Sequence, residues 1–332
     1  MNISVLGAGA WGTAVAMALA AKNEVLMWGR NADAIAHMQA RRENTTYLPG
    51  FSFPEHLQLT PDFATAMAHI AAPDSLLVIA TSVSGLRPTL QACVPYQPGR
   101  VIWLCKGFEE GSQLLPHQVA REVLGTSATI GALSGPSFAQ EVAKGLPCAL
   151  TIASTSTALC QQVVQALHGN AVRVYSSDDL VGVEVGGAVK NILAIATGVA
   201  DGLGLGLNAR AALMTRGLAE ISRLGSALGG KAETLMGLTG LGDLILTCTG
   251  DLSRNRKVGL ALAQGKSLET IIQELGHVAE GVRCAKAVRT LAQQQGVDMP
   301  IADAVASVLF DGISAQEMIT RLLARDAKQE IH

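Results

Sequence analysis

Lys190 stands in the middle of an otherwise apolar stretch, VGGAVKNILAIATGVADG, at residues 185–202. On a helix, which turns by about 100° per residue, one narrow stripe holds Lys190, Ala194, Thr197 and Asp201, with Gly186 and Gly187 one turn earlier. Large apolar side chains face the other way, so the pattern predicts a helix with a buried back and an open front of small side chains. Two interpretations of the lysine are open. It either extends its amine to water at a domain edge, or it serves in an active site with room for a substrate.

A glycine-rich loop, GAGAWG at residues 7–12, fits the pattern G-x-G-x-x-G. The pattern alone is weak in a glycine-rich chain, but here it follows a predicted strand and opens a predicted helix. In such a loop Gly7 makes the turn, Gly9 lets the backbone approach a pyrophosphate, and Gly12 permits close packing. The helix N-terminus offers free N–H groups to the anion. The loop therefore predicts a dinucleotide site, and a tight structural turn is the alternative.

Arg30 stands at the end of the second predicted strand, in the stretch WGRN. A site that prefers NAD usually has Asp or Glu here, which accepts a hydrogen bond from the ribose 2′-hydroxyl. An arginine cannot accept that bond, but it pairs well with a 2′-phosphate. The sequence therefore favours NADP or NADPH, with NAD also possible, unless Arg30 is only a solvated surface residue.

Further along the chain, polar residues stand where strands end or helices begin. They are Lys106 in LCKG, Gly135 and Ser137 in SGPSFAQE, Asp243 in GLGDLILTCTG, and Ser253, Arg254, Asn255 and Arg256 in LSRNRKVG. The last group combines an N-cap residue, free N–H donors and guanidinium groups, which suits a phosphate dianion. Each group taken singly has a structural explanation as a strand-end lysine, a capping residue or a basic helix end. Together they predict a second anion site beside a nicotinamide site.

The elements that must position these residues change in type near residue 178. Before it, helical segments alternate with strands predicted at residues 3–7, 24–30, 75–81, 100–107 and 128–137, followed by CALTIAS and AVRVYSS. After it, glycine-rich turns such as GLTGLGD separate helices predicted at residues 179–200, 208–228, 231–237, 254–264, 267–275, 281–295, 301–310 and 314–327. The chain is thus predicted to be an α/β protein. It has an N-terminal Rossmann-type, doubly wound sheet at residues 1–178 and an all-α C-terminal domain at residues 179–332.

Composition narrows the class of protein. The chain has 332 residues, a net charge of −2 and 49% hydrophobic residues, which gives no reason to expect nucleic acid or an anionic membrane as partner. Six cysteines form no CxxC pair, and we expect reduced thiols in a cytoplasmic protein. No pair or cluster of histidines and cysteines predicts a metal site. The sequence shows no signal peptide and no uninterrupted apolar run long enough to insert into a membrane.

The sequence resembles bacterial NAD(P)-dependent glycerol-3-phosphate dehydrogenase along essentially its whole length. The motifs GAGAWGTA, CKGFE, SGPSFAQEVAKGLP, GLGDLILTCT, SRNRKVG and VAEG stand in the order of that family. The most specific is the long segment around the lysine, GGAVKNILAIATGVADGLGLGLNARAALMTRGLAE. The glycine loop alone is not specific.

The resemblance implies a role for particular residues. Lys190 would be the catalytic acid and base. Substrate contacts would come from Lys106, Gly135, Ser137, Lys190, Asp243, Ser253, Arg254 and Asn255. Cofactor contacts would come from Gly7, Gly9, Ala10, Trp11, Gly12, Arg30, Lys106, Ala139, Arg254, Val278 and Glu280. Family members often have serine where this chain has Ala10, so any side-chain contact there is lost.

The resemblance also implies the activity. The enzyme would reduce dihydroxyacetone phosphate to sn-glycerol 3-phosphate with NADPH, for glycerophospholipid synthesis, and would form a homodimer. Two other functions are alternatives. The nearest alternative is another two-domain dehydrogenase with a lysine base, acting on a 3-hydroxyacid or phosphogluconate. The anion site at SRNR and the position of Asp243 argue against the 3-hydroxyacid version. A redox sensor that regulates transcription should carry a basic helix-turn-helix module, which this weakly acidic chain does not offer.

The chemistry explains a lysine among small apolar residues. Reducing a ketone to a secondary alcohol requires a proton on oxygen as hydride reaches carbon. Burial lowers the pKa of an amine and brings it nearer working pH. As an ammonium group it also polarises the ketone.

Overall fold

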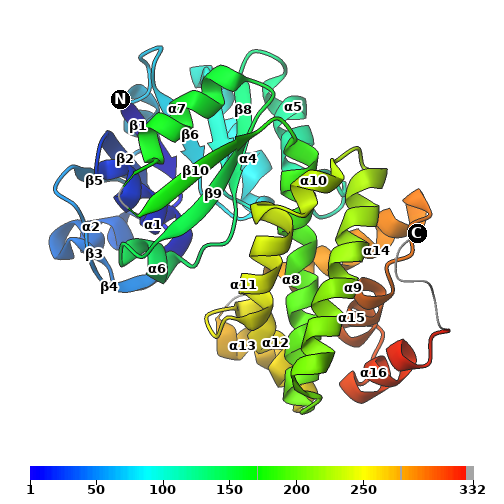
Figure 1. Cartoon of the computed structure of the whole chain (residues 1–332). Helices are drawn as coiled ribbons and strands as arrows, with labels where there is room; N and C mark the ends of the chain where they lie inside the picture. Colours follow the sequence, from blue (N-terminus) through cyan, green and yellow to red (C-terminus); the bar gives the residue numbers. More distant parts are fainter. Residues whose placement is uncertain (170, 277–278, 327–332) are drawn as a thin grey trace.

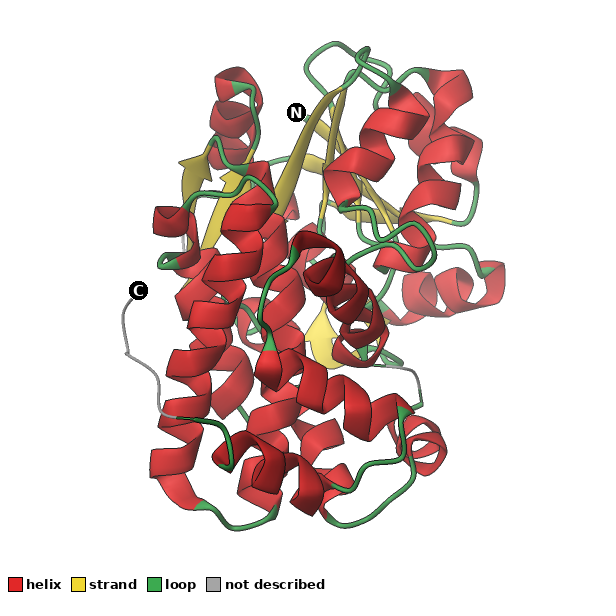
Figure 2. Ribbon diagram, turned by 90° about the vertical axis from the view of Figure 1, so that its right-hand side faces the viewer, coloured by secondary structure: helices red, strands yellow, loops and turns green. Residues whose placement is uncertain are grey.

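The computed structural model describes residues 1–169, 171–276 and 279–326. In that part of the chain, strands and helices alternate up to Ser177, and only helices follow. Figure 1 shows the strands in one half of the molecule and the later helices in the other. The view turned by 90° in Figure 2 shows the same division, with the long strands in the upper half. The predicted fold class, a Rossmann-type sheet followed by an all-α region, is confirmed.

Among the described residues, eight strands form one sheet. In spatial order they are β10 (Val172–Ser177), β9 (Cys148–Ala153), β8 (Thr129–Ser134), β7 (Arg100–Trp103), β6 (Leu76–Ile79), β1 (Asn2–Leu6), β2 (Glu24–Trp28) and β5 (Leu57–Thr60). Neighbouring strands run parallel, except β8 and β9, which are antiparallel. The strand order reverses between β1 and β6. Open α/β sheets bind ligands at such a switch point, outside the carboxyl ends of the strands.

Helices cover both faces of this sheet. They are α1 (Ala10–Ala20), α2 (Ala32–Arg41), α3 (Phe63–Ala68), α4 (Val83–Cys93), α5 (Pro116–Leu124), α6 (Ala139–Ala143) and α7 (Thr157–Leu167). Successive side chains of a strand point to opposite faces, and β6 shows the result. Val78 packs in one core with α1 and α7, whereas Leu77 and Ile79 pack in another with α4 and α5. The sheet is therefore doubly wound.

One region was missed by the sequence prediction. No element was predicted between residues 31 and 74, where the structure has α2, β5, α3 and a separate antiparallel pair, β3 (Glu43–Asn44) and β4 (Leu48–Ser52). The strands there are two to five residues long, so an alternation of apolar and polar residues is hard to detect. The start of α2 carries a local marker, because the side chain of Asn31 accepts a hydrogen bond from the backbone N–H of Ala34.

A buried central helix, α8 (Leu180–Gly202), organises the second half of the chain. The other described helices there are α9 (Gly206–Ala227), α10 (Ala232–Leu235), α11 (Asp243–Thr249), α12 (Arg254–Ala263), α13 (Leu268–Leu275), α14 (Glu280–Gln295), α15 (Pro300–Phe310) and α16 (Ala315–Leu323). Within the described ranges α8 is the one helix long and apolar enough to cross a membrane, but nearly all of it is buried inside the protein. It is a core helix of the fold.

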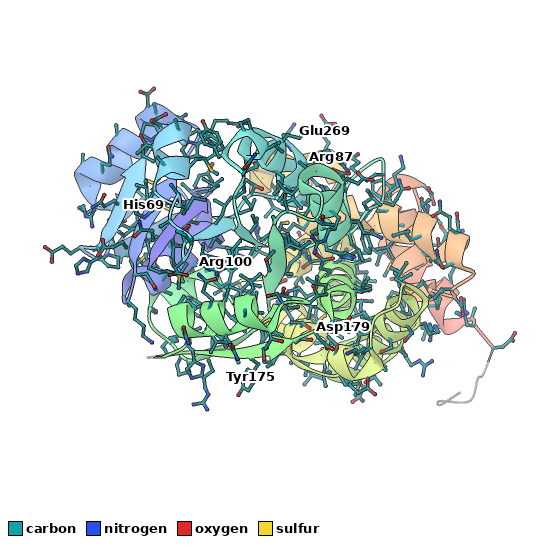
Figure 3. The ribbon with its side chains drawn as sticks, turned by 90° about the horizontal axis from the view of Figure 1, so that it is seen from above. His69, Arg87, Arg100, Tyr175, Asp179 and Glu269 are labelled. Carbon is teal, nitrogen blue, oxygen red and sulfur yellow. The ribbon has the colours of Figure 1, made fainter. Side chains whose placement is uncertain are left out.

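Asp179 fixes the start of α8 (Figure 3). Its carboxylate accepts hydrogen bonds from the backbone N–H groups of Gly182 and Lys231, each at 2.8 Å. The same side chain thus caps α8 and ties it to the residue before α10. This contact anchors the helix that carries Lys190 close to the end of β10.

The predicted open front of α8 is wrong. Every residue from 182 to 200 is buried. A Cβ atom at Gly186 would lie 2.6 Å from the carbonyl oxygen of Thr239, and one at Gly198 would collide with the carbonyl of Arg256. The small residues let neighbouring backbone segments approach α8, so most of the space that they leave is filled by protein.

The segment GLTGLGD is also not the predicted turn. A π-helix at Leu238–Gly242 continues directly into α11. Gly240 fits there because a Cβ would collide with the backbone of Leu235. The central glycine of this segment therefore serves close packing, and not a turn. Single-turn π-helices frequently occur at functional sites, and this one leads straight to Asp243.

Candidate active site

Lys190 is buried and fully engaged by α11. Its Nζ lies 2.5 Å from Asp243 Oδ1 and donates a hydrogen bond to Thr247 Oγ1 at 2.9 Å. Only 7% of its side chain is exposed. The alternative of an amine that extends to water at a domain edge is therefore wrong.

Asp243 joins Lys190 to a second lysine from the sheet. Lys106 follows the end of β7 and reaches Asp243 Oδ2 at 2.7 Å and the carbonyl oxygen of Gly135 at 3.3 Å. The Asp243 side chain is 1% exposed. The structure thus brings four of the predicted site residues together, from four segments of the chain that are distant in sequence. With two ammonium groups on one carboxylate, this cluster carries a net positive charge.

Thr247 is a residue that the sequence analysis missed. Its hydroxyl accepts from Lys190 and donates to the backbone carbonyl of Asp243 at 2.6 Å. It lies one turn after Asp243 on α11, so it occupies the same helix face. The spacing of four residues in DLILT would have indicated it, had α11 been predicted.

The surroundings of Lys190 lower its pKa to about 8. Burial is the largest cause, because it disfavours the charged amine. The negative charge of Asp243 opposes this effect, whereas the positive charge of Lys106 adds to it. An amine with such a pKa can both give and take a proton near neutral pH.

The first residues of α12 connect to α8 and α14 through amide groups. Ser253 caps α12 by accepting from the N–H of Arg256 at 3.2 Å. Asn255 donates to Asn191 Oδ1 and accepts from the N–H of Gly281, both at 2.9 Å. Asn191 also donates to Glu280 at 3.4 Å. Asn191 was not predicted as a site residue, although it directly follows Lys190.

The two arginines of this segment differ. Arg254 is exposed at the first position of α12. Arg256 forms ion pairs with Asp201 and Asp251, at 2.8 and 3.1 Å. The expectation that Arg256 adds a guanidinium group to an anion site is therefore wrong, because its charge is already matched by carboxylates.

The glycine loop has the shape that a pyrophosphate needs. Gly7 has a φ of +129°, and a Cβ there would lie 2.7 Å from the carbonyl oxygen of Ala80. A Cβ at Gly12 would collide with the carbonyl of Gly7, whereas the space in front of Gly9 is open. Gly9 is the N-cap of α1 and its side of the loop is accessible. A dinucleotide therefore fits this loop through the free N–H groups at the start of α1.

Three further predicted cofactor residues lie at or near this loop. Ala10 and Trp11 form the first turn of α1, and Ala139 begins α6, which packs against α1; Trp11 and Ala139 share one small apolar cluster. Ser137 donates to the carbonyl of Gly135 at 3.2 Å.

Arg30 is exposed just after β2, and Glu280 begins α14. Val278 lies outside the described residues.

Two family models cover most of the chain. One, described as the N-terminus of NAD-dependent glycerol-3-phosphate dehydrogenase, matches residues 2–160, and the corresponding C-terminus matches residues 179–320. The chain is 65% identical to a glycerol-3-phosphate dehydrogenase [NAD(P)+] of Herminiimonas arsenicoxydans and 66% identical to one of Janthinobacterium sp. (strain Marseille). Both alignments extend over 331 residues and cover 100% of each chain.

A solved structure agrees with these relatives. The crystal structure of glycerol-3-phosphate dehydrogenase from Coxiella burnetii superposes with a TM-score of 0.92 at 42% identity, covering 97% of this chain and 98% of the other. Sequence and fold thus agree over almost the full length. The chain belongs to the NAD-dependent glycerol-3-phosphate dehydrogenase family.

Proposed function

We propose that Lys190 is the general acid and base of this NAD(P)-dependent glycerol-3-phosphate dehydrogenase, which interconverts dihydroxyacetone phosphate and sn-glycerol 3-phosphate. One observation carries this proposal: the buried Lys190 ammonium group shares the Asp243 carboxylate with Lys106. A buried amine with a pKa of about 8 is suited to transfer a proton in either direction.

The reaction needs one hydride at carbon and one proton at oxygen. NADPH held at the glycine loop by the N–H groups at the start of α1 would supply the hydride. In the reductive direction Lys190 donates the proton to the ketone oxygen and becomes a neutral amine. In the oxidative direction the neutral amine takes the proton from the hydroxyl group. Asp243 holds both lysines in place, and Thr247 fixes the orientation of the Lys190 amine.

The ketone oxygen would be held between the two lysines. Lys106 adds a second positive charge where negative charge develops on that oxygen, which lowers the barrier in a site with little water. Arg254, Asn255, Ser253 and the N–H groups at the start of α12 would bind the phosphate. Gly135 and Ser137 would line the side of the substrate site that lies nearest β8. Phosphate recognition separates this substrate from ketones without a phosphate group.

Several further properties belong to the same proposal. The domain boundary lies between residues 178 and 179, where β10 has ended and Asp179 caps α8. Arg30 favours NADPH over NADH, because no acidic residue stands at the end of β2. The enzyme is a cytoplasmic homodimer without nucleic acid or membrane insertion, and its product enters glycerophospholipid synthesis.

The test is NADPH oxidation by the purified protein and its Lys190→Met variant. The wild type should consume NADPH with dihydroxyacetone phosphate, but not with hydroxypyruvate or unphosphorylated dihydroxyacetone. The variant keeps the length of the side chain but has no transferable proton, so kcat should fall by about 10²–10⁴-fold. NADPH binding, measured by fluorescence, should be unchanged. A variant with near-normal kcat would refute the role of Lys190.

A further inference from the structure

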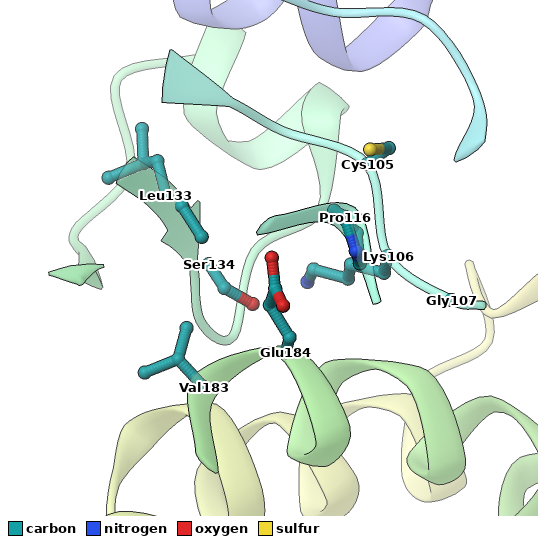
Figure 4. A pocket seen from close by; sticks show the side chains of 9 residues that line it. Cys105, Lys106, Gly107, Pro116, Leu133, Ser134, Val183 and Glu184 are labelled. Carbon is teal, nitrogen blue, oxygen red and sulfur yellow. The ribbon is translucent and has the colours of Figure 1, made fainter. Parts of the chain in front are cut away.

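A small cavity lies beside Lys106, lined by the ends of β7 and β8 and the start of α8. Its volume is about 10 Å³, room for about one water molecule. Figure 4 shows the hydroxyl of Ser134, the carboxylate of Glu184 and the amine of Lys106 pointing toward one another across it. Ser134 is 6% exposed, and its hydroxyl has no hydrogen-bond partner among the described residues. A buried hydroxyl group without a partner is costly, so this geometry favours a bound water.

Glu184 lies between this cavity and His117. Its Oε1 accepts hydrogen bonds from Trp103 Nε1 and the backbone N–H of His117, both at 3.0 Å. Its Oε2 lies 2.5 Å from His117 Nδ1. The Glu184 side chain is 3% exposed, whereas that of His117 is 20% exposed. The pair therefore runs from the buried cavity to the protein surface.

Burial also prepares Glu184 to carry a proton. It raises the pKa of Glu184, and the hydrogen bonds from His117 and Trp103 oppose this shift only in part. The ionisable groups nearest to Glu184 are His117 on α5 and, after β7, Cys105 and Lys106. A carboxyl group placed between a water and an imidazole can pass a proton from one to the other.

The proposed mechanism creates a need for such a group. Each reduction removes one proton from Lys190, whose side chain is 7% exposed and faces Asp243 and Thr247. Bound substrate would also cover the side of the Lys190 amine that faces the ketone, so solvent would not reach the amine from there. The proton must return through neighbouring groups or wait until the product leaves.

We propose that Ser134, Glu184 and His117, with one water in the cavity, form a proton-entry route from solvent to the pair Lys106 and Lys190. This inference rests on the proposed acid–base role of Lys190. Lys106 gives a proton to Asp243 Oδ2, and the carboxyl group turns and delivers it to the Lys190 amine. The water, held in the cavity by the hydroxyl group of Ser134, then protonates Lys106 while it receives a proton from Glu184. His117 restores the proton of Glu184 and takes one from solvent. The sum is one proton taken up per hydride transferred, and no electrons move along the route.

The experiment follows proton uptake and NADPH oxidation together in a single turnover, with a pH-indicator dye and NADPH absorbance. In the wild type, uptake should keep pace with NADPH oxidation. In Glu184→Gln, which keeps the size of the side chain and the acceptor for Trp103, uptake should lag by about tenfold or more. That is less than the 10²–10⁴-fold contributed by a primary acid or base.

Glu220→Gln is the matched control. Glu220 is another buried carboxylate, on α9, and accepts from the N–H groups of Ile301 and Ala302 at the start of α15. Its replacement should leave uptake and oxidation in step. Equal lags in both variants would overturn the route, because general loss of packing would then explain them. Uptake in step with oxidation in Glu184→Gln would overturn it too.

Chemical rescue provides a second test that does not depend on the folding of Glu184→Gln. In His117→Ala the lag should appear and added imidazole should remove it, whereas imidazole should not rescue Glu184→Gln. Failure of imidazole to shorten the lag in His117→Ala would count against the route. Failure of the underlying function is distinguishable, because it would appear as normal NADPH oxidation by Lys190→Met.

Discussion

The charges around Lys190 predict that two substitutions shift its titration in opposite directions. Its pKa is about 8, lowered by burial and by Lys106 and raised by Asp243. A nearby opposite charge favours the charged form of a group, which changes the pKa by about 1–3. For a lysine this raises the pKa. Asp243→Asn should therefore lower the pKa of Lys190 further below its value of about 8. Lys106→Met removes a like charge and should raise the pKa toward that of an ordinary lysine.

The assay is the pH dependence of kcat/KM, which reports groups of the free enzyme. Reduction needs the ammonium form of Lys190, so kcat/KM should be level at low pH and fall above pH 8 or so in the wild type. In Asp243→Asn the fall should begin at lower pH, and in Lys106→Met at higher pH. Oxidation of sn-glycerol 3-phosphate needs the neutral amine, so its kcat/KM should rise through the same pH.

Both substitutions also remove proposed contacts with substrate, so the value of kcat/KM should drop at every pH. The tested quantity is the pH at which kcat/KM begins to fall, and not the value of kcat/KM itself. Lys231→Met, which removes an exposed lysine paired with Asp178, is the control and should leave the pH at which kcat/KM falls unchanged. If the pH at which kcat/KM falls does not change, or if it moves in the same direction in Asp243→Asn and Lys106→Met, Lys190 is not the titrating group.

Three further predictions concern the substrate and cofactor sites. Arg254→Ala removes a charged donor from the proposed phosphate site, so KM for dihydroxyacetone phosphate should rise about 10- to 100-fold; a KM that stays at the wild-type value would show that Arg254 does not bind the phosphate. Arg30→Asp should lower the ratio of kcat/KM for NADPH to that for NADH by about tenfold or more, and an unchanged ratio would mean that Arg30 is only a solvated residue. Gly9→Ala places a methyl group in open space, so Tm should hold while the Kd for NADPH rises about tenfold or more. Gly12→Ala should lower Tm as well, because its Cβ meets the carbonyl of Gly7; equal Tm values would contradict this account.

Much of the fold could be predicted because its determinants are local. The strands of the sheet are short buried apolar runs, and the helices after residue 178 have capping residues such as Ser253, Ser267 and Ser314. The glycine loop is also a local feature, since a turn with a positive φ at Gly7 requires that residue type. The small elements between residues 31 and 74 escaped prediction because short strands depend on partners elsewhere in the chain.

The sequence by itself determined which residue types are present for chemistry, and it marked Lys190 as a charge within an apolar helix. Only the tertiary structure decided what each small residue and each charge does. Gly186 and Gly198 could have bordered a substrate, but neighbouring backbone fills their space. Arg256 could have bound an anion, but the fold places it against Asp201. Asp243 lies 53 residues beyond Lys190 and 137 beyond Lys106. Their contact arises because the sheet and the helices pack at the carboxyl end of β7, a long-range event that no local pattern encodes.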